Sequence, residues 1–231
     1  MRKAALISLF LLAWPAGAAA KPPVLVELFT AQGCGSCNDA SGYLGKLADR
    51  PGVLALTFSV DYWDYLGWTD TFAKPEYAER QKAYVTRLKL REPYTPQVVV
   101  DGREEAQGQK TAEVDRLVRA AAAAPRNPPD IHFVGARRVD VGSARAVKGG
   151  AEVWLVRYDP RAVEVAVKAG DNRGETVVQR NVVREIRRLG TWRGKPQAYR
   201  LPAAADDGLK TVVIVQAPRG GRVLGVAQRK S

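Results

Sequence analysis

The segment PVLVELFTAQGCGSC, residues 23–37, places two cysteines shortly after an apolar run. Residues 23–29 favour a buried strand, because Val, Leu and Phe dominate them. Residues 40–47 carry apolar side chains at positions i, i+3, i+4 and i+7, which lie on one face of a helix. The segment therefore predicts a strand, a Cys-x-x-Cys turn and a helix that opens at this turn.

Cysteines three residues apart at the start of a helix have a defined chemistry. Cys34 and Cys37 can close a small disulfide ring. When the ring is open, the Cys34 sulfur lies near unpaired backbone N–H groups and the positive end of the helix dipole, and both favour the thiolate. The thiolate is the form that attacks disulfides. Cys34 is therefore the predicted attacking sulfur, and Cys37 the resolving one.

Two other functions of these cysteines stay open. A structural disulfide is one, although such a bond more often joins cysteines far apart in sequence, since longer loops gain more stability. Copper(I) binding by the two thiolates is the other. A zinc site would need two further ligands, and the chain has a single histidine, His132. We expect redox chemistry first, without a cofactor or a resident metal.

The rest of the first half alternates strands and helices. Strand-like runs lie at 53–60 and 97–100, and helix-like runs at 74–88 and 111–121. Asp101-Gly102 is a hairpin turn signal after the second of these strands. This order predicts an α/β domain over residues 21–126, a mixed sheet flanked by helices, with a helical insertion around 61–90.

The second half has a different pattern. Pro125, Pro128 and Pro129 follow an alanine run, which indicates a helix stop and a linker near 125–130. Beyond it, six or seven short β-rich runs are separated by turn signals, so residues 130–231 predict an all-β, sandwich-like domain. Most of the excess of Lys and Arg behind the net charge of +12 lies in this half.

Residues 1–20 have the pattern of a signal peptide. Arg2 and Lys3 precede an apolar run of eleven residues, and Ala18-Ala19-Ala20 offers a cleavage site. The run is shorter than the roughly 20 residues that span a bilayer. We expect a periplasmic or secreted protein, with no stable membrane insertion after cleavage and no nucleic acid as partner. Disulfides persist in that compartment.

Two further positions concern the dithiol. Pro96 opens the strand at 97–100, and either a cis bond after Thr95 or an ordinary trans proline fits there. Glu27 lies in the first strand, seven positions before Cys34. It either lies buried beneath the dithiol, where it could accept the proton of Cys37, or it points to solvent.

An aromatic segment, Asp61-Tyr62-Trp63-Asp64-Tyr65-Leu66-Gly67-Trp68, begins where the second strand ends. Because the carboxyl ends of parallel strands share one edge of a sheet, this segment is expected near Cys34. Its rings form a floor for a peptide or an apolar ligand, or they pack among themselves. Asp61, Tyr62 and Trp63 are therefore candidate substrate-binding residues, and His132 is expected to be structural.

The pattern of strand, Cys34-x-x-Cys37, helix and Thr95-Pro96 before a strand resembles the thioredoxin fold over residues 23–124. This resemblance implies that the Thr95–Pro96 bond is cis and faces the dithiol, and that the Thr95 backbone holds a partner chain. It also implies that Glu27 corresponds to the buried acid of that fold, with an offset of about one residue.

The chain also resembles a family of secreted bacterial thioredoxin-like proteins, catalogued as domain of unknown function 1223. The motifs that carry this resemblance are ELFTAQGCGSC at 27–37, VDYWDYLGW at 60–68 and YTPQ at 94–97. The resemblance implies a thiol–disulfide oxidoreductase that acts on periplasmic protein thiols or disulfides. The alternative is a non-enzymatic binding module with a structural disulfide.

Overall fold

The computed structural model describes residues 21–204 and 208–230, so the predicted signal peptide lies outside the described residues. The elements of the first half are β1 (Val24–Thr30), α1 (Cys37–Ala48), β2 (Val53–Ser59), the short 3-10 helix η1 (Asp64–Leu66), α2 (Pro75–Leu88), β3 (Gln97–Val100), β4 (Glu104–Gln107) and α3 (Thr111–Ala123). The second half is built from strands, which are β5 (Ile131–Val134), β6 (Arg138–Val141), β7 (Ala151–Asp159), β8 (Val163–Ala166), β9 (Thr176–Gln179), β10 (Val182–Trp192), β11 (Gln197–Arg200), β12 (Lys210–Gln216) and β13 (Val223–Gln228).

Within the described residues, eight strands form one large mixed sheet in the order β13-β12-β7-β10-β2-β1-β3-β4. β1 and β2 pair in parallel, whereas β1 with β3 and β3 with β4 are antiparallel. β1 is buried along its whole length, because strands flank it on both sides and helices cover both its faces. The mixed sheet flanked by helices was predicted from the sequence, and it is confirmed.

The two halves of the chain share this sheet, a result that differs from the expected separate sandwich. β10 lies beside β2, where Val182 pairs with Thr57. Asn181 strengthens the junction, since its backbone carbonyl accepts a hydrogen bond from Thr57 and its side-chain amide donates to the carbonyl of Ala55 at 2.7 Å. The physical reason is that β2 would otherwise be an open sheet edge, and the start of β10 pairs with part of it.

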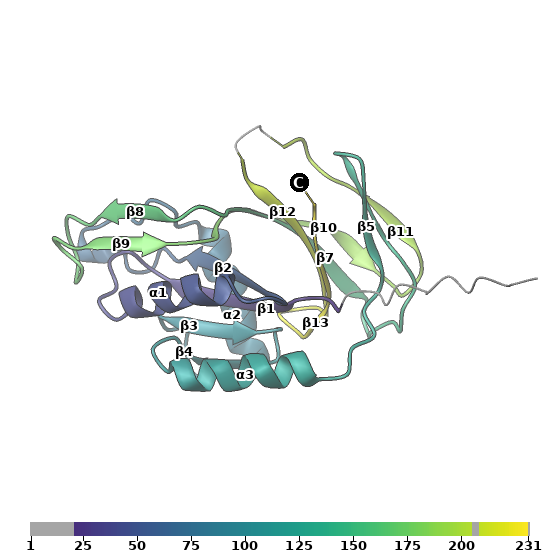
Figure 1. The fold of residues 1–231 in the computed structure, drawn as a ribbon, viewed down its shortest axis with the longest axis horizontal. Coiled ribbons are helices and arrows are strands. Elements are labelled where there is room, and N and C mark those ends of the chain that lie inside the picture. Colours follow the sequence, from purple (N-terminus) through teal and green to yellow (C-terminus); the bar gives the residue numbers. More distant parts are fainter. Residues whose placement is uncertain (1–20, 205–207, 231) are drawn as a thin grey trace, which may run out of the picture.

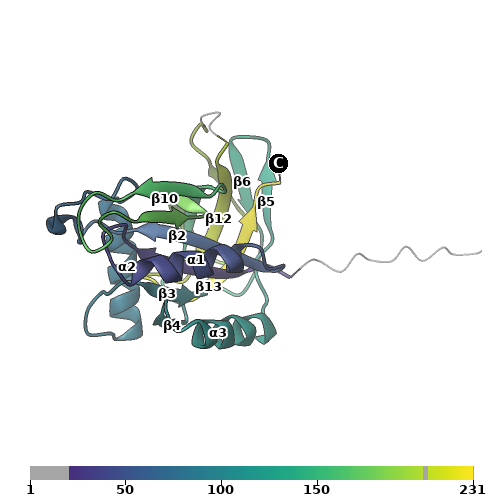
Figure 2. The ribbon, with the colours of Figure 1, turned by 60° about the vertical axis from the view of Figure 1, so that its left-hand side comes forward.

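Alternation along β1 sends its side chains to two cores. Val26 and Leu28 face the core that α1 and α3 cover, on the side seen in Figure 2. Leu25 and Phe29 face the opposite core, which contains Tyr77 and Tyr84 of α2. Because β1 feeds directly into α1, the loop between them lies at one edge of this three-layer arrangement.

A small sheet, in the order β11-β6-β5, packs against the large one. Its side chains Val139, Val141 and Tyr199 share a third core with Val153 and Leu155 of β7. The second half is therefore antiparallel and has two facing sheets, as a sandwich has. One of these sheets is the continuation of the α/β sheet, so the sandwich is not a separate body.

The hairpin of β8 and β9 leaves the second half and runs beside α1 (Figure 1). Arg180, just after β9, donates to the carbonyl of Gly45 and forms an ion pair with Asp49 at 2.7 Å. This hairpin brings its connecting loop, residues 167–175, to the β1–α1 junction. We call this loop the 167–175 strap.

Candidate functional site

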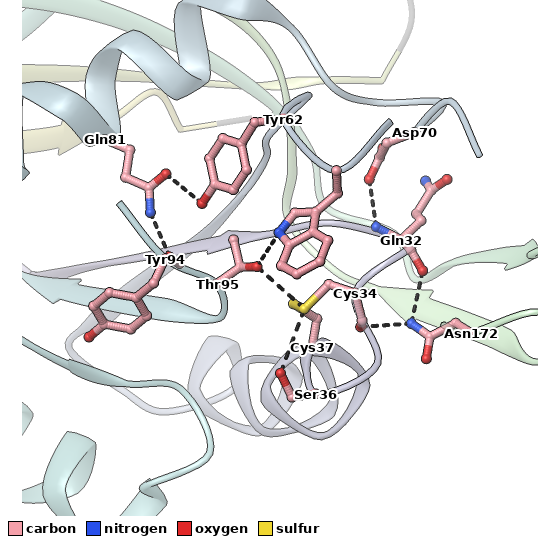
Figure 3. The surroundings of a disulfide bond; sticks show 11 residues. Gln32, Cys34, Ser36, Cys37, Tyr62, Asp70, Gln81, Tyr94, Thr95 and Asn172 are labelled. Atoms are coloured by element: carbon pink, nitrogen blue, oxygen red, sulfur yellow. Dashed lines mark hydrogen bonds between the residues drawn. A yellow bond between two sulfur atoms is a disulfide. The ribbon is translucent and has the colours of Figure 1, made fainter. Parts of the chain in front are cut away.

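Cys34 and Cys37 form a disulfide at the junction of β1 and α1, with their Cα atoms 5.4 Å apart (Figure 3). Cys37 is the first residue of α1. Its backbone N–H donates to the carbonyl of Cys34 at 3.0 Å. The backbone N–H of Cys34 in turn donates to the carbonyl of Ala31 at 3.2 Å. Two tight turns therefore present the ring at the N-terminus of the helix.

Thr95 and Pro96 lie directly against this ring. The Thr95–Pro96 peptide bond is cis, as the resemblance implied. The Thr95 hydroxyl donates a hydrogen bond to Cys34 Sγ at 3.3 Å. Behind the proline, Gly108 leaves room, because a Cβ at this position would lie 2.9 Å from that of Pro96. The start of β3 is thereby held close to the first sulfur.

Trp63 orients the Thr95 hydroxyl. Its indole Nε1–H donates to Thr95 Oγ1 at 2.7 Å. A threonine hydroxyl has only one hydrogen, so an oxygen that accepts from the indole directs its own hydrogen to another acceptor. Here that acceptor is Cys34 Sγ. In the reduced protein, the same donor would stabilise the Cys34 thiolate.

The start of α1 adds opposing electrostatic effects. The helix dipole favours a negative sulfur at its N-terminus. Ser36 Oγ lies 3.7 Å from Cys34 Sγ and can donate to it. Asp39, in the first turn of the helix, places a negative charge nearby and acts against the thiolate.

The 167–175 strap covers the other side of the ring. Asn172 donates its side-chain amide to the carbonyls of Gln32 and Cys34, both at 2.8 Å (Figure 3). Asp171 donates its backbone N–H to the carbonyl of Gly33 at 3.2 Å. A Cβ at Gly35 would lie 3.1 Å from that of Asp171, so the small residue permits this close approach. Three hydrogen bonds, two of them from the Asn172 side chain, therefore join the strap to backbone carbonyls of the cysteine loop.

Both sulfurs are covered as a result. The exposed fraction is 2% for Cys34 and 1% for Cys37. Thr95 and Trp63 lie on one side of Cys34, and the strap lies on the other. A folded partner therefore cannot reach Cys34 unless part of this cover moves away.

The aromatic segment after β2 lies beside the site, and its residues differ in their roles. Tyr62 donates its hydroxyl to Gln81 Oε1 at 3.1 Å, and burial raises the pKa of its phenol to about 12. Trp63 reaches the disulfide through Thr95. Asp61 makes no side-chain hydrogen bond or ion pair within the described residues. Tyr65 is 78% exposed and stacks on Trp63 with 6.3 Å between the ring centres.

Glu27 is buried, and its carboxylate is paired with side chains of α2. Its carboxylate accepts from Arg80 Nε at 2.6 Å and from the Tyr84 hydroxyl. These partners belong to α2, on the face of the sheet opposite α1. Because successive side chains of a strand point to opposite faces, Glu27 lies on the same face of β1 as Leu25 and Phe29, whose core also contains Cys34 and Cys37. The expectation of a solvent-facing acid is therefore wrong, and the role of proton acceptor for Cys37 stays a prediction.

A family model described as "Protein of unknown function (DUF1223)" matches residues 25–216. The chain belongs to the DUF1223 family. The sequence expectation of this membership is thereby confirmed. No curated protein matches the chain.

Two solved structures are similar to this DUF1223 protein. The crystal structure of protein AGR_C_4864 from Agrobacterium tumefaciens has 30% sequence identity and a TM-score of 0.74, and the match covers 91% of this chain and 95% of that one. HBP35 of Porphyromonas gingivalis has 11% identity and a TM-score of 0.61, with 91% and 76% of the two chains covered. The second likeness concerns the fold alone.

Several residues of the site in this DUF1223 protein had not been singled out in the sequence. Gln32 Oε1 accepts from Trp68 Nε1 at 3.0 Å, and the Gln32 backbone N–H donates to Asp70 at 2.7 Å. Burial raises the pKa of Asp70. Asn172 is 138 residues from Cys34 in sequence. No short-range pattern connects such residues, although Gln32 was within reach as a neighbour of the Cys-x-x-Cys turn.

Two features of the described residues bear on metal binding and on membrane insertion of this DUF1223 protein. No group of three or more His, Cys, Asp or Glu side chains in residues 21–204 and 208–230 is arranged to hold a metal ion. His132 lies exposed in β5. In the same part of the chain, no helix is long and apolar enough to cross a membrane.

Proposed function

We propose that this DUF1223 protein is an exported thiol–disulfide oxidoreductase that acts through Cys34 and Cys37. The observation that carries the proposal is the hydrogen bond from Thr95, the residue before a cis proline, to Cys34 Sγ at a strand-to-helix junction. The parallel β1–α1–β2 unit and the antiparallel β3–β4 pair followed by α3 support a thioredoxin-like arrangement of this region. The disulfide and the signal-like residues 1–20 support a periplasmic or secreted location.

The exchange proceeds in two steps. In the reduced protein, the Cys34 thiolate attacks a disulfide of the partner, forms a mixed disulfide and releases one partner thiolate. The Cys37 thiolate then attacks Cys34 Sγ, restores the Cys34–Cys37 bond and releases the second partner thiolate. Two electrons pass from this protein to the partner. The reverse sequence oxidises a partner dithiol.

The burial of Cys34 adds a condition to this proposal. The strap or the Trp63 side must move before a protein substrate can reach the sulfur, because Cys34 is 2% exposed in the closed arrangement. Asn172 and Thr95 are the side chains that hold these two sides against the cysteine loop. We therefore propose that the partner offers an extended segment, which enters beside Thr95 once the cover opens.

The decisive experiment measures the reduction potential of the Cys34–Cys37 bond in glutathione buffers. We expect a potential higher than about −300 mV, the upper range of structural disulfides in secreted proteins. A Cys37→Ala variant should accumulate a mixed disulfide with an exported protein, and Cys34→Ala is the matched control that should trap nothing. A potential below that range together with no trapped partner would contradict the proposal.

A second candidate is a binding module in which the disulfide only holds the cysteine loop. The burial of both sulfurs favours it, because reactive cysteines are usually partly exposed. It predicts that Cys34→Ser lowers the melting temperature strongly and that the bond resists reduction. The redox proposal predicts instead that the oxidised and reduced proteins differ modestly in stability, so one set of melting curves separates the two candidates.

A further inference from the structure

A cleft of about 330 Å³ lies between the two halves of the chain, away from the disulfide. The residues just before β1 and the linker after α3 form one wall, with Pro23 and Pro129. The turn before β13 and its first residues form another, with Val223. The volume is at the small end of the range of about 300–1,000 Å³ that is typical of ligand pockets. The cleft therefore suits a small molecule.

Four arginines from separate parts of the chain line this cleft. They are Arg103 of the β3–β4 turn, Arg126 of the linker, Arg145 of the β6–β7 connection and Arg222 just before β13. A single acid, Asp101, accompanies them. Four guanidinium groups and one carboxylate give the cleft a marked positive potential, which its walls focus.

Asp101 does not neutralise this excess. Its carboxylate accepts from the backbone N–H of Leu25 at 2.9 Å and forms an ion pair with Arg126 Nη2. Arg126 also donates to the carbonyls of Pro23 and Ala121. This pair is therefore occupied in joining the linker to β1 and to the β3–β4 turn.

The other three arginines have no such partners. Within the described residues, the guanidinium groups of Arg103, Arg145 and Arg222 make no hydrogen bond and no ion pair within 4.0 Å. All three side chains are exposed, so they can turn into the cleft without a loss of native contacts. Guanidinium groups bind phosphate and carboxylate oxygens in a two-point geometry. Three of them around one small cleft form a receptor for an anion.

We propose that this cleft binds a small, multiply charged anion that bears phosphate or carboxylate groups. Arg103, Arg145 and Arg222 hold the anion, the Asp101–Arg126 pair fixes the base of the site, and the prolines keep the walls rigid. Because the interaction is largely electrostatic and near the surface, its affinity falls as ionic strength rises. The proposal does not depend on the redox function.

The test titrates the oxidised full-length protein with inorganic pyrophosphate and, separately, with citrate, by calorimetry at low salt. We expect saturable one-to-one binding of at least one of them. The triple variant Arg103→Gln, Arg145→Gln, Arg222→Gln should weaken this binding at least tenfold. The control triple variant Arg87→Gln, Arg187→Gln, Arg200→Gln has the same net charge but no arginine removed from the cleft, and it should change the affinity less than twofold.

Vesicles containing phosphatidylglycerol, at the same salt concentration, distinguish the source of the anion. Binding of pyrophosphate or citrate without binding of vesicles assigns the cleft to a free anion. Vesicle binding that pyrophosphate displaces, and that only the cleft variant loses, assigns it to a lipid headgroup, and both results support the proposal. Equal losses in the two triple variants, or no binding of any probe, would overturn it. Circular dichroism of each variant checks that it is folded.

Discussion

The hydroxyl of Thr95 lies between the indole N–H of Trp63 and the sulfur of Cys34. The bond from the indole occupies the hydroxyl oxygen and so directs the hydroxyl hydrogen to the sulfur. Removal of the hydroxyl deprives the sulfur of a hydrogen bond, and removal of the indole N–H frees the hydroxyl to rotate. The chain Trp63–Thr95–Cys34 thus gives two positions at which the reactivity of Cys34 can be changed without touching a cysteine.

We predict that Thr95→Val, which keeps the side-chain shape, lowers the thiolate fraction of reduced Cys34. Hydrogen bonds to charged groups contribute about 1.5–3 kcal/mol, so alkylation of Cys34 at neutral pH should slow about tenfold or more. Trp63→Phe should act in the same direction with a smaller effect. Trp68→Phe is the control, since its N–H contacts Gln32 instead. Unchanged alkylation in Thr95→Val would refute this role of the hydroxyl.

A second residue-scale prediction concerns Glu27, whose partner Arg80 is also buried. Glu27→Gln leaves the guanidinium without its counter-charge, and breaking a buried ion pair costs about 3–5 kcal/mol of unfolding free energy. Urea unfolding measures this loss. The reduction potential of the disulfide, by contrast, should stay within experimental error of the wild type. A clear change in the reduction potential without the loss of stability would instead support a role of Glu27 in the chemistry of the dithiol.

At the scale of elements, the 167–175 strap determines access to the disulfide. It comes from a hairpin of the second half, yet it is closed on the first half by Asn172. Backbone bonds at both ends of the loop, from Val167 to Glu175 and from Gly174 to Val167, keep it compact. We therefore expect the strap to move as a unit when its contacts with Gln32 and Cys34 are lost.

We predict that Asn172→Ala speeds reduction of the disulfide by dithiothreitol. Two buried hydrogen bonds are lost, each with a net contribution of about 1 kcal/mol, so the open population rises roughly tenfold or more. Asn181→Gly is the matched control, because it also removes a buried asparagine amide and tolerates the positive φ of 51°. Its reduction rate should match the wild type. If the disulfide of Asn172→Ala were reduced at the wild-type rate, the strap would not limit access to the disulfide.

β10 illustrates how packing overrides local pattern at this scale. β10 begins with the apolar pair Val182 and Val183, and the basic residues Arg184, Arg187 and Arg188 follow. The strand continues to Trp192. Its charged side chains are accommodated at the surface, where Arg188 approaches Glu152 at 3.8 Å and Arg184 lies over the ring of Phe72 at 3.9 Å. Pairing with β7 along this length stabilises a run that its composition alone disfavours.

For the whole molecule, the sheet that both halves build implies that neither half is stable without the other. One core contains Leu25 and Phe58 of the first half together with Val156, Val183 and Ile214 of the second. Separation of the halves would expose this apolar surface and the edge of β2. The prolines at 125–129 therefore mark a change of architecture along the chain.

We predict that both halves unfold in one cooperative step. Differential scanning calorimetry should give a single transition with equal calorimetric and van't Hoff enthalpies. Hydrogen exchange at β1 and at β12 should report the same opening free energy. Two resolved transitions, each assigned to one half, would instead show that the halves are independently folding domains.

The parts of this protein that follow from the sequence are local ones. The strand before Cys34, the helix after Cys37 and the turn at Asp101 depend on propensity, periodicity and a few neighbouring residues. The family membership also follows, because the motifs around Cys34, Trp63 and Pro96 lie in short continuous segments.

Only the tertiary structure decided which face Glu27 occupies, which residue closes the site and whether the halves are separate. A register difference of one residue turns a strand side chain to the opposite face. The exact pairing of β1 with β2 and β3 therefore decides that Glu27 faces α2. Asn172 reaches Cys34 across 138 positions of sequence. Such contacts depend on how completed elements pack and how their free edges pair, and no pattern within a single segment contains that information.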